Sequence, residues 1–381
     1  MRWVVGLGAL LLLGGVLWDA FETVILPRRA SGRLRLTRLF YRASWRPWRA
    51  IAATLRGGRQ QAFLSFYGPL SLLMLLSLWA ASIVVAFGGL QWAAGSALSS
   101  PGAARGFGTD LYMSGTTFFT LGLGDVVPQT AVARALTVVE SGTGFAFLAI
   151  VIGYLPVIYQ GFSRREIAIS LLDARAGTPP SAGELLWRHR DDPKHERLAD
   201  LLREWEQWAA EVLESHLSYP ALAYFRSQHN NQSWLAALVT ILDTSALVMV
   251  GLEGFCVRQA RLTFAMARHA VVDLAQVFTK PPTEPVAERL PDVELDRLRT
   301  RLIQGGMKLR DGGLADELAE LRVLYEPYAA ALAVYLGLAL PPWVRTVERP
   351  DNWQTSAWKL ERRPRERAPA PTRAPTDETH F

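Results

Sequence analysis

Three long stretches with almost no charge constrain this chain more than any other feature of its sequence. Residues 60–104 hold no charged side chain, residues 135–163 hold only Glu140, and residues 3–26 hold only two acids. A helix of about 20 apolar residues is long enough to cross the hydrocarbon core of a bilayer. Because each stretch reaches this length, the sequence predicts an all-α membrane protein with three spans.

The first stretch predicts a retained transmembrane anchor helix over residues 1–27. Its apolar core starts near the N-terminus, as in a secretory signal, which is the alternative. However, no cleavage pattern of small residues follows, and the chain continues into an arginine-rich loop. Asp19 and Glu22 lie close in sequence to Arg28 and Arg29, so we expect salt bridges at this end of the helix.

Residues 28–60 carry ten arginines and no acid. A loop this basic stays on the cytoplasmic side of the membrane. The N-terminus is then outside, and the chain after the third span is cytoplasmic, in a multi-pass protein of the cell membrane. The net charge of +6 could suggest nucleic acid. Since the arginines lie between two spans, lipid headgroups are the nearer partner, and we expect no nucleic-acid partner.

The spacing of the arginines within this loop predicts an amphipathic helix at the membrane surface. The arginines concerned are Arg33, Arg35, Arg38, Arg42, Arg46 and Arg49. A voltage sensor instead needs arginines inside an apolar span. The six arginines either bind anionic lipid, which could then couple to gating, or only orient the chain, and the sequence leaves both open.

Between the second and third stretches lies the segment TTFFTLGLGDVVP, residues 116–128. The residues around its start predict a short helix over 109–119, which Thr109 or Asp110 can cap. This helix is shorter than a full span, so the segment must enter the membrane and return to the same side. Irregular backbone at that depth is tolerated only where it lines a water-filled path or is buried in protein.

Gly122 and Gly124 give this segment a backbone freedom that other residues lack. Successive carbonyls can therefore point the same way. A row of carbonyls facing an axis can replace the water shell of a cation.

The segment resembles the pore signature of the potassium-channel superfamily, which usually reads T-T-x-T-T-V-G-Y-G-D. The matching residues are Thr116, Thr117, Thr120, Gly122, Gly124 and Asp125, while Leu121 stands for Val, Leu123 for Tyr and Phe119 for Thr. The layout is similar to the two-span bacterial type with an extra N-terminal span. The resemblance implies a pore domain over residues 61–163, with outer helix 63–93, pore helix 109–119, filter 120–125 and inner helix 132–162.

The resemblance also implies the chemistry of this pore. Potassium sites would be formed by the carbonyls of Thr120, Leu121, Gly122 and Leu123 and by the Thr120 hydroxyl, with Asp125 at the outer mouth. Because residues 111–120 contain no acid to share a proton, we expect Asp125 to be ionised. One chain supplies one pore loop and four must surround the ion, so a homotetramer is implied. Potassium is the permeant ion, and no cofactor is expected.

Leu123 leaves the selectivity open. In the family, the tyrosine at this position braces the filter by packing and by a hydroxyl hydrogen bond, whereas leucine cannot donate. The first prediction is a potassium-selective channel. A weakly selective cation channel, or a non-conducting membrane sensor or scaffold with a pore-like fold, are the alternatives.

Five residues are expected to support or gate the pore. The resemblance implies a gating hinge at Gly144, although close packing against the pore helix is the alternative use of a small residue there. Pro156 predicts a kink near the end of the inner helix. Glu140 is a lone carboxylate within a span, and it could contact the base of the filter or bond to a pore-helix group such as the Thr116 hydroxyl. Thr117 is the fifth candidate.

Residues 164–360 predict a helical cytoplasmic domain that modulates the pore. Helices are expected at about 196–216, 232–252, 257–278, 292–304 and 313–338. The second of these is apolar enough for a fourth span. Asp243 at its centre and the basic helix that follows favour a cytoplasmic bundle instead. The tail 361–381 is rich in Pro and charge and predicts disorder.

Several function classes lack support in the sequence. It contains no dinucleotide-binding glycine motif and no calcium loop, and its six histidines show no metal-ligand spacing. No nucleophile or pair of acids stands out, so the chain is not expected to be an enzyme. Cys256 is the only cysteine and cannot form an intrachain disulfide. The ligand of the C-terminal domain is not predicted.

Overall fold

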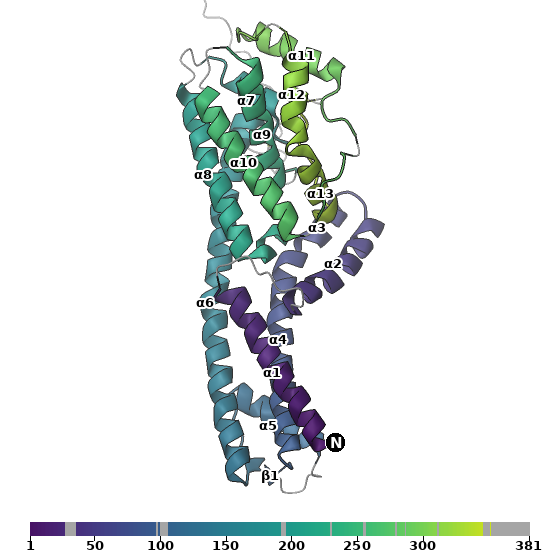
Figure 1. The fold of residues 1–381 in the computed structure, drawn as a ribbon, viewed down its shortest axis with the longest axis vertical. Helices are drawn as coiled ribbons and strands as arrows, with labels where there is room; N and C mark the ends of the chain where they lie inside the picture. Colours follow the sequence, from purple (N-terminus) through teal and green to yellow (C-terminus); the bar gives the residue numbers. More distant parts are fainter. Residues whose placement is uncertain are drawn as a thin grey trace, which may run out of the picture.

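The computed structural model describes residues 1–26, 36–96, 98–99, 106–191, 196–228, 231–253, 257–278, 280–285, 287–310, 312–345 and 351. Within these residues the chain is mostly helical and elongated, and one long helix, α6, runs along one edge of its lower half (Figure 1). The predicted all-α fold is confirmed. The expectations for Arg28, Arg29, Arg33, Arg35, Cys256 and the tail 361–381 concern residues outside the described ranges.

Four helical stretches in the described part of the chain are long and apolar enough to cross a membrane. They are α1 (Arg2–Val24), the stretch Gly58–Ala93 that holds α3 (Gly58–Ser65) and α4 (Tyr67–Ala93), α6 (Ala131–Ala176) and α9 (Trp234–Gly251). The chain is therefore a multi-pass membrane protein. The fourth differs from the rest, because 89% of the apolar window of α9 is buried inside the protein.

α1 and α4 pack through small residues. A Cβ added at Gly6 would lie 3.0 Å from the Cβ of Ala93, and one added at Gly89 would lie 3.0 Å from that of Ala9. Small residues let helix backbones approach closely in a membrane. At the other end of α1, the buried Asp19 accepts hydrogen bonds from the Trp79 indole at 3.0 Å and from Thr37.

α5 (Phe107–Phe118) is the short helix between α4 and α6. It begins two residues before the predicted start, after Gly106, so neither Thr109 nor Asp110 is its N-cap. Asp110 instead lies in the first turn, where its carboxylate accepts a hydrogen bond from Ser96 at 2.6 Å. Beyond α5, β2 (Val127–Pro128) pairs antiparallel with β1 (Leu98–Ser99).

α6 is longer than the predicted inner helix 132–162. It runs unbroken for 46 residues, passes through Pro156 and ends only at Gly177, whose φ is 80°. The helix therefore crosses the boundary expected at residue 163 and enters the C-terminal bundle (Figure 1). The physical reason is that residues beyond 162 find partners in the bundle, as the contacts of Arg165 show below.

The C-terminal bundle consists of short and long helices around α9. They are α7 (Ala182–Arg188), α8 (Glu196–Ser218), the 3-10 helix η1 (Pro220–Tyr224), α9, α10 (Val257–Val277), α11 (Asp292–Gln304), α12 (Leu314–Val323) and α13 (Glu326–Leu336). The single helix expected at 313–338 is thus split in two, because Pro327 starts a new helix. α7 was not predicted, although the Ser181 hydroxyl accepts from the backbone N–H of Glu184 as an N-cap does.

Asp243 is fully buried at the centre of α9 and is paired there. Arg289 donates to its carboxylate at 2.5 Å, and the Tyr325 hydroxyl donates at 2.5 Å. Arg289 also binds Glu326 at 2.6 Å. A buried carboxylate held by a cation from a separate segment favours the interior of a bundle over a lipid-facing span.

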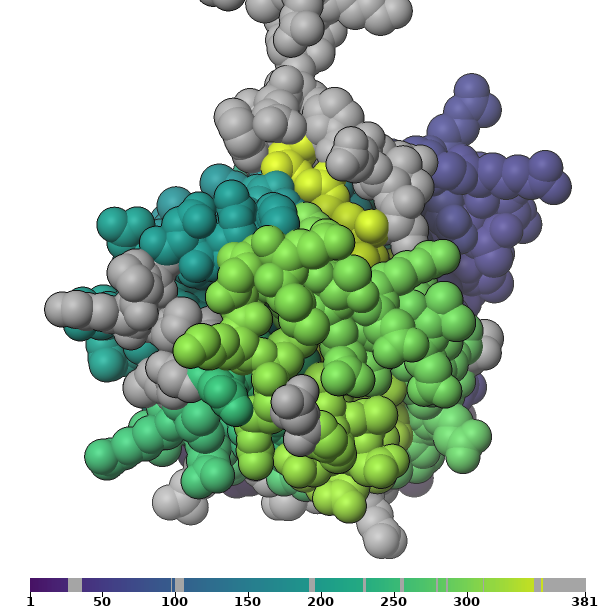
Figure 2. Space-filling model, turned by 90° about the horizontal axis from the view of Figure 1, so that it is seen from above, coloured from purple at the N-terminus to yellow at the C-terminus, as the bar shows by residue number. Residues whose placement is uncertain are grey.

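α2 (Leu36–Thr54) forms the helix predicted from the arginine spacing and projects to the side of the bundle (Figures 1 and 2). Its buried side chains are Tyr41, Trp45 and Ala52. The indole of Trp45 donates to the carbonyl of Tyr335 at the end of α13, at 3.0 Å. α2 therefore links the membrane helices to the C-terminal bundle.

Candidate functional site

Residues 120–125, the candidate filter, directly follow α5 and have an alternating backbone. Thr120, Gly122 and Gly124 have φ values of 57°, 56° and 77°, while the residues between them have negative φ. Thr120 is one of three non-glycine residues in the described part of the chain that adopt a positive φ. A left-handed conformation at every second residue is the geometry that lets successive carbonyls turn to one side of a strand.

The end of α5 holds the start of the candidate filter through its backbone. The N–H of Thr120 donates to the carbonyl of Thr117 at 3.0 Å, and the N–H of Leu121 donates to that of Thr116 at 2.7 Å. The Thr116 hydroxyl donates to the Met113 carbonyl at 2.9 Å. Thr116 and Thr117 thus hold the first residues of the candidate filter through their main-chain carbonyls.

Asp125 is tied back to the short helix. The hydroxyl of Tyr112 on α5 donates to the Asp125 carboxylate at 2.9 Å. The absence of acids from residues 111–120 gave no sign of this tyrosine as a partner of Asp125. Tyr112 lies thirteen residues before Asp125, in a helix, so only the return of the chain brings the two together.

Glu140 lies where α4, α5 and α6 meet. Its carboxylate is buried and hydrogen-bonds to the hydroxyl of Ser114 on α5, which in turn lies 2.7 Å from the carbonyl of Val84 on α4. Glu140 therefore bonds to a hydroxyl of the short helix, as one of the two expectations had it, but this hydroxyl belongs to Ser114 and not to Thr116. The two hydroxyls lie on different faces of α5. Ser114 points toward α4 and α6, while Thr116 bonds within its own helix.

Gly144 touches the C-terminal end of α5. A Cβ added at Gly144 would lie 2.1 Å from the carbonyl oxygen of Phe118, whereas a Cβ added at Gly142 would meet nothing within 4 Å. Close packing, the alternative to a hinge, accounts for the glycine at 144. The hinge stays a prediction.

One chain leaves the candidate filter uncovered. The side chains of Leu121 and Leu123 are 62% and 64% exposed. Of the apolar window of α6, only 11% is buried. These surfaces are available to lipid or to further copies of the chain.

One known protein family matches this part of the chain. Residues 72–160, which hold most of α4, all of α5, the candidate filter and the first part of α6, match the model of a family described as ion channel. Residues 72–160 are an ion channel domain. The channel domain accords with the prediction that the chain is not an enzyme. No curated protein and no solved structure matches the chain significantly.

The channel domain is joined to the C-terminal bundle by Arg165, just beyond its last matched residue. The buried guanidinium donates to the carbonyls of Leu222 and Phe225 at 2.9 and 2.7 Å and pairs with Glu166 at 3.0 Å. It also lies 3.2 Å from the Nε2 atom of His216 on α8. Sequence reasoning missed this contact, because its members lie far apart in the chain.

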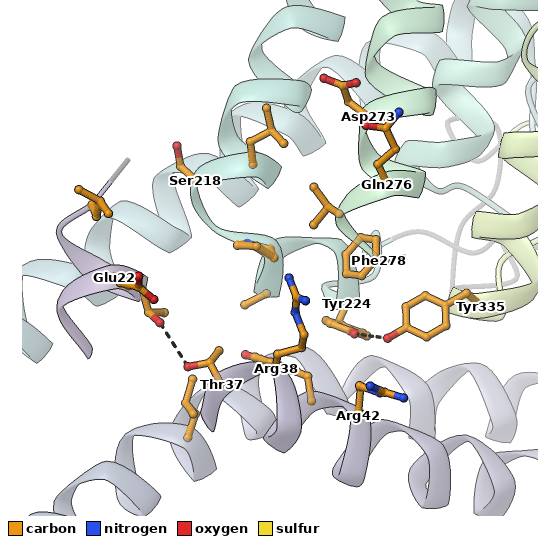
Figure 3. A pocket seen from close by; sticks show the side chains of 18 of the residues that line it. Glu22, Thr37, Arg38, Arg42, Ser218, Tyr224, Asp273, Gln276, Phe278 and Tyr335 are labelled. Atoms are coloured by element: carbon orange, nitrogen blue, oxygen red, sulfur yellow. Dashed lines mark hydrogen bonds between the residues drawn. The ribbon is translucent and has the colours of Figure 1, made fainter. Parts of the chain in front are cut away.

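A cavity of about 270 Å³ lies where the channel domain, α2 and the bundle meet (Figure 3). Arg38 of α2 points into it from one side, and Asp273 and Gln276 of α10 line the opposite side. The hydroxyls of Tyr224 and Tyr335 hydrogen-bond at its edge, 2.7 Å apart. Within the described residues, no cluster of three or more His, Cys, Asp or Glu side chains could hold a metal ion.

Proposed function

We propose that this protein is a tetrameric potassium-selective channel that conducts potassium passively through residues 120–125. The observation that carries the proposal is the alternation of left-handed residues at Thr120, Gly122 and Gly124, directly after α5. Four such strands around one axis would offer rings of carbonyl oxygens from Thr120, Leu121, Gly122 and Leu123. Carbonyl oxygens can replace the hydration shell of a potassium ion.

The electrostatics of the channel domain favour a cation. The carbonyl end of α5 lies at the start of the candidate filter, and the C-terminus of a helix carries partial negative charge. Asp125 adds an exposed carboxylate at the other end of the segment. Both ends of the proposed path therefore attract positive ions.

The incompleteness of the single chain supports the tetramer. One strand offers oxygens to an ion from one side only. The side chains of Leu121 and Leu123 are exposed in the single chain. Closed rotational symmetry with four copies would supply both the missing oxygens and the missing contacts.

A weakly selective cation channel is the second candidate, and Leu123 is the observation that favours it. This side chain has no hydroxyl to donate behind the filter, so the carbonyl rings would be held less rigidly. Bi-ionic reversal potentials with potassium on one side and sodium on the other separate the two candidates. A sodium permeability close to zero supports the selective channel, and a substantial one supports the weakly selective channel.

Potassium flux from protein reconstituted in liposomes tests the proposal directly. Gly122→Ser should abolish flux, because a serine at φ of 56° is strained and would shift the carbonyls. Gly58→Ser is the matched control, since a Cβ at that first residue of α3 meets nothing within 4 Å. If the unaltered protein forms tetramers but passes no potassium, it is a membrane sensor or scaffold with a pore-like fold.

We also propose the orientation with the N-terminus outside and the C-terminal bundle in the cytoplasm. Its support is the positive-inside rule applied to residues 28–60. Consistent with it, the N-terminus lies at the same end of the molecule as β1 and the candidate filter (Figure 1). Protease protection in sealed vesicles, read out by antibodies to either terminus, tests this orientation.

A further inference from the structure

The cavity of about 270 Å³ at the junction is lined by segments from both parts of the chain (Figure 3). Its lining residues come from the membrane helices α1, α4 and α6, from α2, and from α8, η1, α10 and α13 of the bundle. Pockets that hold drug-sized ligands measure roughly 300–1,000 Å³. The cavity lies just below this range, so its size suits a small organic molecule.

Arg38 brings an unpaired positive charge to this cavity. The side chain is half-buried, and its guanidinium points into the cavity (Figure 3). It forms no hydrogen bond and no salt bridge with any residue that the structure describes. By contrast, the buried Arg289 of the bundle holds two carboxylates. A partly buried cation without a partner favours the binding of an anion beside it.

Tyr41 offers a second unmet group on the same wall. It lies three residues after Arg38 on α2, so the two share one face of that helix, and it also lines the cavity. Its hydroxyl is buried and has no hydrogen-bond partner among the described residues. Buried hydroxyls normally find a partner. A ligand oxygen that accepts from Tyr41 would supply one.

Aromatic rings form much of the rest of the wall. Tyr41 stacks on Tyr224 with the ring centres 5.2 Å apart, and Phe278 meets Tyr224 edge-on at 5.9 Å. The hydroxyls of Tyr224 and Tyr335 hydrogen-bond to each other. These two side chains therefore offer rings to a ligand, and further rings pack well against them in edge-to-face or offset arrangements.

Two carboxylates limit the negative charge that the cavity accepts. Glu22 and Asp273 also line it. Neither is without a partner, and Asp273 lies 2.9 Å from the Nε2 atom of His269, so neither calls for a cationic ligand. Both repel a second negative charge. A singly charged carboxylate therefore fits the cavity better than a phosphate group does.

We propose that this cavity binds a small aromatic carboxylic acid. The carboxylate pairs with the Arg38 guanidinium, which presents two parallel N–H groups to such a partner, and accepts a hydrogen bond from the Tyr41 hydroxyl. The ring of the acid packs against Tyr224 and Phe278. Because the lining comes from the membrane helices and from the bundle, the bound acid fastens one to the other. The site is independent of the ion that the channel domain conducts.

Isothermal titration calorimetry of the full-length protein in nonionic detergent tests the site, with cinnamate as the probe and the heat from protein-free micelles subtracted. Arg38→Gln should weaken binding about thirty-fold, because the charge-assisted pair is lost. Arg258→Gln, at the opposite end of α10 from Asp273, is the charge-matched control and should bind as the unaltered protein does. Equal affinity in the two variants, or no saturable binding to the unaltered protein, overturns the proposal.

Two further ligands test the chemistry on the unaltered protein. Cinnamamide keeps the ring without the charge and should bind about tenfold more weakly than cinnamate, so equal binding would overturn recognition of the carboxylate. Decanoate keeps the charge without the ring, and binding tighter than that of cinnamate would overturn the aromatic class in favour of a fatty acid.

Tyr41→Phe and thermal unfolding complete the test. Tyr41→Phe keeps the ring on Tyr224 and should weaken cinnamate binding about five-fold, as expected for one neutral hydrogen bond. Cinnamate should raise the melting temperature of the unaltered protein, because a ligand of the folded state stabilises it, and should do so less in Arg38→Gln. An equal rise in both would overturn the site. Since no ion flux is measured, failure of conduction and failure of this site are separate results.

Discussion

At the scale of single residues, the channel domain depends on a few contacts with no room for change. The tightest is between Gly144 on α6 and the carbonyl of Phe118, the last residue of α5. Thr120 follows two residues later, so a displacement of Phe118 is passed directly to the candidate filter. A contact this close to the candidate filter makes the backbone of α6 part of the support of residues 120–125.

Gly144→Ala should therefore reduce both potassium flux and thermal stability. The added methyl group would lie 2.1 Å from the Phe118 oxygen, and overpacking of this kind costs about 1–3 kcal/mol. Gly142→Ala is the control and should leave both properties intact, because a Cβ there meets nothing within 4 Å. A Gly144→Ala protein that keeps its thermal stability but gates differently would favour the hinge over close packing.

Tyr112→Phe should loosen the outer end of the candidate filter. The variant loses the hydrogen bond to Asp125 at 2.9 Å, which we expect to contribute about 1 kcal/mol. Selectivity for potassium over sodium should fall, as measured by bi-ionic reversal potentials. Tyr159→Phe removes a hydroxyl from an exposed tyrosine of α6 and should have no effect. Unchanged selectivity in Tyr112→Phe would show that this bond does not brace the filter.

At the scale of elements, α6 belongs to both the channel domain and the bundle. Arg165 is the residue where the two meet, and His216 of α8 faces its guanidinium. The Nδ1 atom of His216 lies 2.8 Å from the Val212 carbonyl, so the neutral ring donates there and accepts from Arg165 through Nε2. Burial first, and the charge of Arg165 second, lower the pKa of His216 to about 3.

Acid should weaken this junction. A histidine in the unfolded chain has a pKa of about 6.5, so it binds a proton at a pH where the folded His216 is still neutral. The folded state therefore loses stability as the pH falls from about 6.5 toward 3. Ser215 and Trp234 also contact the ring and carry no charge, and the charged Arg165 that faces it is paired with Glu166. From pH 7 to pH 5 the loss should be about 2 kcal/mol from this group alone.

Thermal unfolding of the full-length protein at pH 7 and pH 5 checks this expectation. His216→Gln should show a smaller acid-induced decrease in melting temperature, since glutamine can still accept from Arg165 without titrating. His269→Gln, at an exposed site on α10, should keep the full decrease. The junction would not be acid-sensitive if His216→Gln and the unaltered protein lost the same stability.

At the scale of the whole molecule, local patterns allowed more to be predicted than distant contacts. Uncharged runs suffice to predict the membrane helices, because they reflect the surrounding solvent. Glycine spacing suffices to predict the irregular segment after α5, because it reflects the freedom of the backbone. Neither signal depends on a particular contact partner. α5 was placed within two residues, yet its link from Tyr112 to Asp125 required the chain to return on itself. Arg165 and His216 are 51 positions apart, and Lys280 is more than 200 positions from the arginines of α2 that it lies near. No spacing rule predicts such pairs.

The continuity of α6 has a mechanical consequence. From Gly144 to its end at Ala176 the helix extends about 48 Å, while from Gly144 back to Ala131 it extends about 20 Å. If the contact with Phe118 is the fulcrum of a stiff lever, the bundle holds the long arm. A sideways displacement of the bundle then moves the end of α6 at Ala131 by less than half as much, and the force at that end is larger in proportion.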